Sequence, residues 1–269
     1  MTYNSLEVSN YNGAPVALYE FEVGETSWRY TSARTNITLL GNTWTSAAIS
    51  DEGLTFSGNS DDDEFVITLP VNDFTDLFTS TPPSSTIYVT VRRLHYGDDD
   101  APVVWSGTMK SLKRENALVC KLTCRTITSS LNRLGLRLSF SRNCPHSLYD
   151  VSCGVVKALY GQTAMVMSLT GNSFIHNGPI PAGANYYSGG FLEFTVNGLI
   201  ERRPIESQVG STITLLTSTD DMTIGTIVTL YPGCDRTTNT CNSKFNNLSN
   251  YGGFPQLPTK SPFDFDPIF

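Results

Sequence analysis

Two widely separated pairs of cysteines constrain this chain more than any other feature of its sequence. Cys144 and Cys153 lie on one turn-rich stretch, and Cys234 and Cys241 lie on another that follows the alternating stretch 226–231. The residues around both pairs are rich in Pro, Gly, Asn, Asp and Ser, which is typical of loops and turns. Four thiols presented on open backbone can close on one metal centre, and such a centre would pin the second half of the chain.

The alternative to a metal is a pair of disulfides, which require an oxidising compartment. No apolar signal segment follows the first Met, and no uninterrupted apolar run is long enough to span a bilayer. We therefore expect synthesis in a cytoplasm, where thiols stay reduced, and no membrane span. Clustered cysteines in that setting indicate metal binding more often than cystine formation.

The spacing of the cysteines leaves the identity of the metal open. Structural zinc sites usually take closely spaced pairs of cysteines, and both pairs here are spaced more widely. Four thiolates also suit a [4Fe–4S] cluster, which is larger and accepts ligands from more open loops. From spacing alone we rank an iron–sulfur cluster first, zinc second and buried free thiols third. His146 is a possible replacement ligand, but its position two residues after Cys144 favours a neighbouring role.

The remaining two cysteines have a different pattern. Leu118, Cys120, Leu122 and Cys124 alternate with more polar residues, so a strand would place all four on one face. No turn residues flank them to wrap an ion. We interpret Cys120 and Cys124 as small core residues rather than metal ligands.

The composition favours a β-rich protein without a nucleic-acid surface. The chain has 269 residues and a net charge of −7, and Gly, Ser, Thr, Asn and Pro together are abundant in it, a profile with many turns. Phosphate binding requires clustered Lys and Arg, whereas the basic residues here are scattered. We expect no direct nucleic-acid specificity.

The first half of the chain indicates a barrel-like β domain at residues 1–135. A pair suited to a tight hairpin turn, Gly41-Asn42, separates two short strands. Apolar residues at helical spacing predict one short helix at 71–78. The expected strands are 15–23, 28–30, 36–40, 43–47, 54–56, 64–69, 87–94 and 103–107.

The second half indicates a small antiparallel β-domain, a barrel or a sandwich, bracketed by its cysteine pairs. We place this domain at 136–254, with Asn197-Gly198 as a further hairpin turn. Its expected strands are 164–169, 191–196, 203–206, 212–216 and 224–231.

The proline-rich tail at 255–269 permits two interpretations. One is a disordered end, because so many prolines exclude a central strand. The other is an extended arm whose Phe263, Phe265 and Phe269 fill pockets on a neighbouring subunit.

Little in the sequence indicates catalysis. The acidic runs 61–64 and 98–100 lack the spacing of a calcium loop and fit solvated hairpin tips. The three histidines, His95, His146 and His176, sit in no recognisable catalytic signature. We therefore do not expect an enzyme.

The stretches that carry a family resemblance are Tyr231 to Cys241, the run 242–255, Cys144 to Gly154, and 187–194 followed by Arg202-Arg203. They resemble the C-terminal signature of tailed-phage tail-tip and baseplate hub proteins, a family also found as the hub of gene transfer agents. The likeness covers the second half of the chain and fits the first half more loosely. Two departures from the family pattern, at 149–152 and at Tyr251, do not touch a cysteine.

The resemblance implies a structural virion protein at the tail tip, made in the host cytoplasm and trimeric around the tail axis. It would link the tail tube or distal tail protein to a central spike or fibre. It also implies that Cys144, Cys153, Cys234 and Cys241 hold a [4Fe–4S] cluster. We expect a structural or conformational-trigger role for the cluster rather than electron transfer, because no redox partner motif accompanies the site. Two alternatives are a metal-dependent, tail-associated cell-wall hydrolase and a secreted, disulfide-bonded adhesin.

Overall fold

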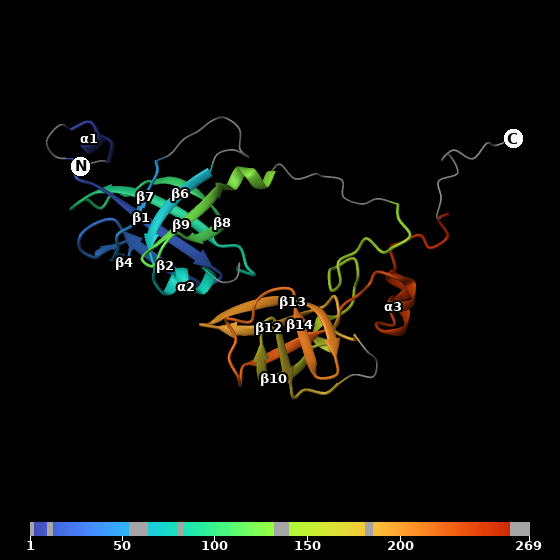
Figure 1. Cartoon of the computed structure of the whole chain (residues 1–269). Coiled ribbons are helices and arrows are strands. Elements are labelled where there is room, and N and C mark those ends of the chain that lie inside the picture. The colour runs from blue at the N-terminus through green and yellow to red at the C-terminus, as the bar shows by residue number, and fades with distance from the viewer. Residues whose placement is uncertain are drawn as a thin grey trace, which may run out of the picture. The chain divides into compact units, whose positions relative to one another are not determined.

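The protein is mostly β, as the sequence predicts. The computed structural model describes residues 3–9, 13–53, 64–79, 83–131, 140–180 and 185–258. The chain divides into two compact units, Met1–Arg133 and Leu134–Phe269. Strands make up most of the regular structure in both units, and the helices are short (Figure 1).

The first unit is built on one nine-stranded sheet in the order β3-β4-β2-β1-β7-β8-β9-β6-β5. Neighbouring strands within this sheet are antiparallel, except that β2 and β4 are parallel. Among the described residues the edge strands β3 and β5 do not pair, so the structure differs from the barrel-like closure that we expected. Alternation along a sequence indicates strands but not edge pairing, and β5 is only two residues long. The elements are α1 (Tyr3–Glu7), β1 (Pro15–Val23), β2 (Thr26–Thr31), β3 (Ile37–Leu39), β4 (Asn42–Ser46), β5 (Ser50–Asp51), β6 (Glu64–Pro70), α2 (Asp73–Thr79), β7 (Tyr88–His95), β8 (Val103–Arg114), β9 (Val119–Thr126) and a 3₁₀ helix, η1 (Ile127–Leu131).

The hairpin between β3 and β4 turns one residue earlier than the sequence indicates. Leu39 pairs with Asn42, so the two turn residues are Leu40 and Gly41, with φ of 51° and 76°. Two positive φ values give the turn whose twist matches the flanking strands. Gly41 adopts this conformation freely, whereas a leucine is disfavoured there by about 1–2 kcal/mol. That penalty explains why sequence reasoning chose Gly41-Asn42.

The expected short helix is confirmed as α2, starting two residues later than predicted. A reciprocal cap fixes its start: Asn72 Oδ1 accepts from Thr75 N at 3.0 Å, and Thr75 Oγ1 accepts from Asn72 N at 2.8 Å. Phe74 on this helix is fully buried and stacks on Phe21 of β1, with ring centroids 4.6 Å apart.

Cys120 and Cys124 are core residues, as expected. Both lie in β9 and are fully buried together with Leu122. Burial raises the pKa of the Cys124 thiol, which stays neutral. Leu118 was assigned to the same face incorrectly: it is 76% exposed, because it precedes β9 in a turn where Asn116 Oδ1 accepts its N–H at 2.9 Å.

The second unit contains a closed six-stranded barrel in the order β10-β11-β14-β13-β12-β15, with every pairing antiparallel. The barrel alternative is thus confirmed, and so is the Asn197-Gly198 turn, where both residues have positive φ. Strand β11 was not predicted, because its four residues are too few for a clear alternation. The elements are a 3₁₀ helix, η2 (Lys157–Leu159), β10 (Gln162–Thr170), β11 (Ser173–His176), β12 (Phe191–Val196), β13 (Leu199–Val209), β14 (Thr212–Leu215), β15 (Ile227–Tyr231), α3 (Thr238–Ser243) and a second 3₁₀ helix, η3 (Leu248–Asn250).

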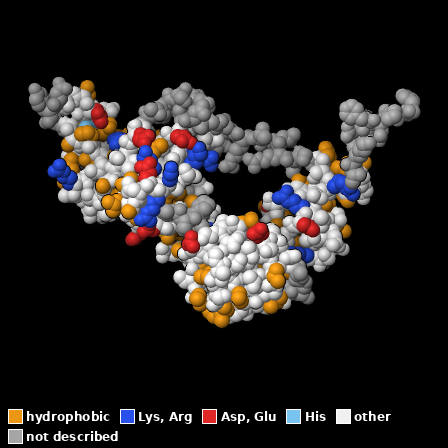
Figure 2. All heavy atoms as spheres, in the orientation of Figure 1, with side chains coloured by type: hydrophobic (Ala, Val, Ile, Leu, Met, Phe, Trp, Pro, Cys, Tyr) orange, Lys and Arg blue, Asp and Glu red, His pale blue; other side chains and the backbone are white. Residues whose placement is uncertain are grey.

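The barrel core is largely apolar, and its described strands also bury the polar side chains His176 and Gln208 and a charged network around Arg203. Arg203 is 3% exposed; its Nη1 donates to Glu201 Oε2 at 2.8 Å, and its Nη2 pairs with Asp221. The core residues are Ala164, Val166, Phe174, Tyr187, Leu192, Phe194, Ile205, Ile213, Leu215, Met222, Val228 and Leu230. Hydrophobic side chains also gather on one outer side of this unit (Figure 2).

Several expectations fall outside the described residues: the strand 54–56, the acidic tip at 61–63, and Phe263, Phe265 and Phe269 of the tail. In the part of the chain that the structure describes, no helix is both long and apolar enough to cross a membrane.

Candidate metal centre

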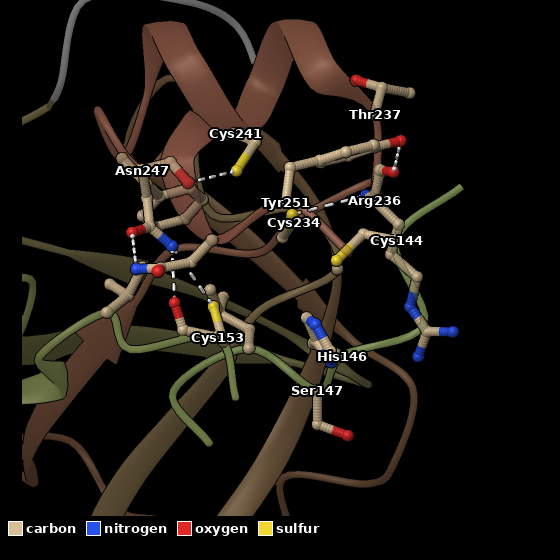
Figure 3. Close-up of a pocket in the computed structure, with 15 residues that line it drawn as sticks. Cys144, His146, Ser147, Cys153, Cys234, Arg236, Thr237, Cys241, Asn247 and Tyr251 are labelled. Carbon is tan, nitrogen blue, oxygen red and sulfur yellow. Dashed lines mark hydrogen bonds between the residues drawn. The ribbon is translucent and has the colours of Figure 1, made fainter. Parts of the chain in front are cut away.

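The four cysteines that the sequence singled out line one cavity. Cys144 and Cys153 reach it from the segment before β10, and Cys234 and Cys241 reach it from the loop after β15 and from α3. The cavity has a volume of about 180 Å³. Figure 3 shows the four sulfur atoms around a common space. All four are free thiols.

Asp150 shapes the turn between the first two cysteines. Its carboxylate accepts from Cys153 N at 2.6 Å and from Ser147 N at 3.1 Å, and its carbonyl accepts from Gly154 N at 2.9 Å. Tyr149 and Gly154 have positive φ on either side. One aspartate therefore closes the loop that carries Cys153.

The second pair is positioned by a similar arrangement. Asp235 Oδ1 accepts from Thr237 N at 2.9 Å and from Thr237 Oγ1 at 2.8 Å. Thr237 in turn caps α3 by accepting from Thr240 N at 3.3 Å. These contacts hold the loop of Cys234 against the short helix that carries Cys241.

Asn247 links the two cysteine segments. Its Nδ2 donates to Cys153 O at 2.6 Å and lies 3.8 Å from Cys153 Sγ. Its carbonyl accepts from Cys241 Sγ at 3.3 Å, and its N–H donates to Cys241 O at 3.0 Å. Asn250 Nδ2 holds the Asn247 amide oxygen at 2.7 Å, which leaves the Nδ2 group directed at Cys153 (Figure 3).

The Tyr251-Gly252-Gly253 segment closes over the Cys144 loop. Tyr251 OH donates to Arg142 O at 2.7 Å and to Arg236 O at 3.1 Å, and Cys144 N also donates to Arg236 O, at 3.0 Å. A methyl group on Gly252 would lie 2.3 Å from His146 Nε2, so a side chain at this position would require the His146 ring to move. His146 therefore lines the cavity next to Cys144 and packs against the Gly252 segment.

The cavity lining suits soft ligands better than hard ones. Among the described residues that line it, none is Asp or Glu, and Arg236 adds a positive charge. Thiolates without carboxylates select zinc or iron–sulfur centres over calcium or magnesium. In the described ranges, no group of three or more His, Cys, Asp or Glu side chains is placed so that it could hold a metal ion as it stands.

The thiols of the second pair are held in the neutral form. Burial raises the pKa of Cys241, and the other three cysteines raise it further. Burial also raises the pKa of Cys234; the Arg236 N–H, which donates to its sulfur at 3.3 Å, opposes this rise. A metal that binds here would therefore displace protons.

The other titratable candidates lie elsewhere. His95 is buried in β7, where its Nδ1 accepts from Ala14 N at 3.1 Å, and His176 is buried in β11, where its Nδ1 accepts from Gly178 N at 3.1 Å. Neither lines the cysteine cavity, and the same is true of Cys120 and Cys124.

Comparisons with known proteins agree with this architecture. Residues 185–261 match the model of a family described as phage conserved hypothetical protein BR0599. No curated protein matches the chain. Among solved structures, a similar chain occurs in the virion of a native gene transfer agent (GTA) particle; it has a TM-score of 0.77 and 18% identity, over 98% of this chain and 95% of that chain. The two chains share one fold.

Sequence reasoning found the four cysteines but assigned no role to Asp150 or Asn247. Asn247 lies in the stretch that carries the family resemblance, and Asp150 lies at a departure from it. Their roles depend on hydrogen bonds between distant segments, which no local pattern reveals.

Proposed function

We propose that this chain is a structural virion protein of a phage or gene-transfer-agent particle, placed at the tail tip or baseplate hub. The observation that carries the proposal is the fold likeness to a chain of the GTA virion over nearly the full length of both chains. The phage family match at residues 185–261 supports it independently. The hub would be a homotrimer that joins the tail tube or distal tail protein to a central spike or fibre.

A [4Fe–4S] cluster held by Cys144, Cys153, Cys234 and Cys241 is the second part of the proposal. The donor set is four thiols around a cavity whose described lining residues include no carboxylate, which fits such a cluster chemically. Zinc is the second choice. It would draw all four sulfurs to about 2.3 Å from one ion.

The proposed role of the cluster is structural. It would tie together two segments separated by the whole barrel, residues 154–233. By analogy with a disulfide across a loop of similar length, such a closure contributes about 4–5 kcal/mol. The surrounding residues of this chain orient the thiols and restrict water, chiefly through Asn247, Asp150 and Tyr251.

Purification under anaerobic conditions tests the metal assignment. We expect iron and acid-labile sulfide in the wild-type protein, with broad absorbance near roughly 400 nm. Cys144→Ser and Cys234→Ser should lose both, whereas Cys120→Ser, the matched control, should keep them. A colourless protein that contains zinc would replace iron–sulfur by the second choice; a protein without metal would refute the centre.

Two further measurements test the hub assignment. Light scattering during size-exclusion chromatography should give a trimer mass, and antibodies against the chain should label one end of the tail in electron micrographs. Labelling of the capsid or along the whole tail would contradict the placement.

We also propose that the chain is not an enzyme. A catalytic zinc site keeps an open position beside ligands that usually include His or Glu, whereas this cavity presents four cysteines, with His146 as a further lining residue. Incubation with peptidoglycan should release no soluble fragments. Release that is abolished by a His146 substitution would favour the cell-wall hydrolase instead.

A further inference from the structure

A half-buried lysine lies next to the cysteine cavity without taking part in its lining. Lys244 is the residue directly after α3. The Nζ of Lys244 donates to Gly233 O at 2.7 Å and to Tyr186 O. The ammonium group also lies over two rings, 4.6 Å from the centroid of Tyr186 and 5.6 Å from that of Phe245.

These contacts join three segments: the loop that carries Cys234, the helix that carries Cys241, and the segment that precedes β12. Gly233 directly precedes Cys234, and Lys244 N donates to Thr240 O at 3.1 Å, next to Cys241. Tyr186 belongs to the segment that precedes β12 of the barrel. Lys244 therefore ties both cysteines of the pair to the barrel.

Carbonyls and rings attract the ammonium group but do not neutralise it. Among the described residues, no carboxylate forms an ion pair with Lys244. The nearby carboxylate of Asp235 accepts hydrogen bonds from Thr237 N and Oγ1 at 2.9 and 2.8 Å. A partly buried charge without a counter-ion is costly, so the position of this cation requires a reason.

A four-thiolate centre supplies that reason. The negative charge of four thiolates exceeds the positive charge of a zinc ion, and it also exceeds that of an iron–sulfur core. The complete centre is therefore anionic whichever of the two is bound. The cysteine cavity is thus the place where the missing counter-charge would arise.

We propose that Lys244 is the electrostatic partner and positioning residue of the four-cysteine centre, an inference that rests on the metal centre proposed above. Its charge stabilises the anionic centre, and its bond to Gly233 O holds Cys234 in place.

The test compares four variants of the full chain, purified anaerobically. Lys244→Met removes charge and hydrogen bonds, Lys244→Gln keeps a donor without the charge, and Lys244→Arg keeps the charge. Lys157→Met is the matched control, because Lys157 also lies over two rings, Phe191 and Tyr231, but has its own carboxylate in Glu193 at 2.6 Å.

Two readouts separate charge from packing: the rate of iron release to a chelator and the midpoint reduction potential of the centre. Lys244→Met and Lys244→Gln should release iron at least about tenfold faster and have lower potentials, since loss of a positive charge disfavours adding an electron. Lys244→Arg and Lys157→Met should stay close to wild type.

Three results would overturn the inference. The inference fails if Lys244→Met or Lys244→Gln releases iron at the wild-type rate and keeps the wild-type potential. It also fails if Lys244→Arg releases iron as fast as Lys244→Met, because the charge of residue 244 would then have no effect. A wild-type protein without metal would instead refute the centre itself, and with it this inference.

Discussion

At the scale of single residues, the site depends on side chains that bridge segments far apart in the sequence. Asn247 is the clearest case. It contacts Cys153 through its amide and Cys241 through its backbone, so one residue from each cysteine pair is held by the same asparagine. Its geometry is fixed independently by Asn250.

Asn247→Leu keeps the side-chain volume but removes the donor to Cys153. Loss of this part-buried hydrogen bond costs about 1 kcal/mol, and the Cys153 loop should become looser. We expect faster metal release to a chelator and easier proteolysis of the second unit. Asn172→Leu is the control, because it removes a similar bond, Nδ2 to Leu215 O at 3.0 Å, away from the cysteines. Equal release from both variants would contradict a special role for Asn247.

Metal loading should depend on pH in a direction set by the thiols. The raised pKa values of Cys234 and Cys241 mean that both thiols are protonated in the metal-free protein at neutral pH. Each proton displaced on binding makes affinity rise by about tenfold per pH unit below the thiol pKa. Competition titrations with zinc at several pH values should show this rise, and pH-independent affinity would contradict it.

The stability of the metal-free protein should respond to pH in the opposite direction. A thiol whose pKa is raised on folding stabilises the folded state fully below the unfolded thiol pKa, about 8.5. That contribution is lost as the pH rises through the folded pKa. Thermal melts of the apo-protein should therefore show a lower melting temperature in alkaline buffer, and Cys234→Ser should reduce this dependence.

At the scale of elements, the second cysteine pair depends on a close backbone contact. A methyl group on Gly233 would lie 2.2 Å from Ser188 O, and one on Gly190 would lie 2.1 Å from Tyr231 O. The two loops therefore touch backbone to backbone, a contact that only glycine permits. This contact places Cys234 against the barrel.

Gly233→Ala should displace the Cys234 loop, because the obstructing atom is a backbone oxygen that cannot rotate away. We expect loss of metal, measured as iron per chain, while the circular dichroism of the strands is largely kept. Gly13→Ala is the control, since its nearest neighbour would lie at an ordinary 3.5 Å. Full metal content in Gly233→Ala would show that the loop adapts.

The β3–β4 hairpin offers a stabilising change. Leu40 has φ of 51° and is 71% exposed, so it gains little from packing. Asparagine tolerates this conformation better than leucine, and Leu40→Asn should stabilise the first unit by about 1 kcal/mol. Denaturant unfolding followed by tryptophan fluorescence measures it, and a destabilised variant would contradict the strain argument.

This hairpin also shows what the sequence could and could not predict. Asn197-Gly198 obeyed the turn rule and was found, whereas Leu40-Gly41 violated it and was misplaced by one residue. The four cysteines were found because their spacing and flanking turns are local features. The sequence did not predict that the sheet of the second unit closes into a barrel while that of the first stays open, nor did it predict the role of Asn247. Both depend on contacts between distant segments that no local pattern records.

At the scale of the whole molecule, the two compact units carry different optical signals. The three tryptophans, Trp28, Trp44 and Trp105, all lie in the first unit. The four cysteines of the proposed centre all lie in the second. Tryptophan fluorescence therefore follows the first unit, while limited proteolysis and metal content follow the second.

Removal of the metal by a chelator should accordingly loosen the second unit without unfolding the first. The closed loop between Cys153 and Cys234 holds the barrel strands, so losing its closure removes the estimated 4–5 kcal/mol from that unit alone. The denaturant midpoint by tryptophan fluorescence should stay unchanged, whereas cleavage within 140–258 should accelerate. Cys144→Ser should reproduce this pattern. Cys120→Ser should lower the fluorescence midpoint and leave cleavage within 140–258 unchanged, because Cys120 is buried in the sheet of the first unit. A fluorescence midpoint that falls together with metal loss would mean that the centre stabilises both units as one cooperative structure.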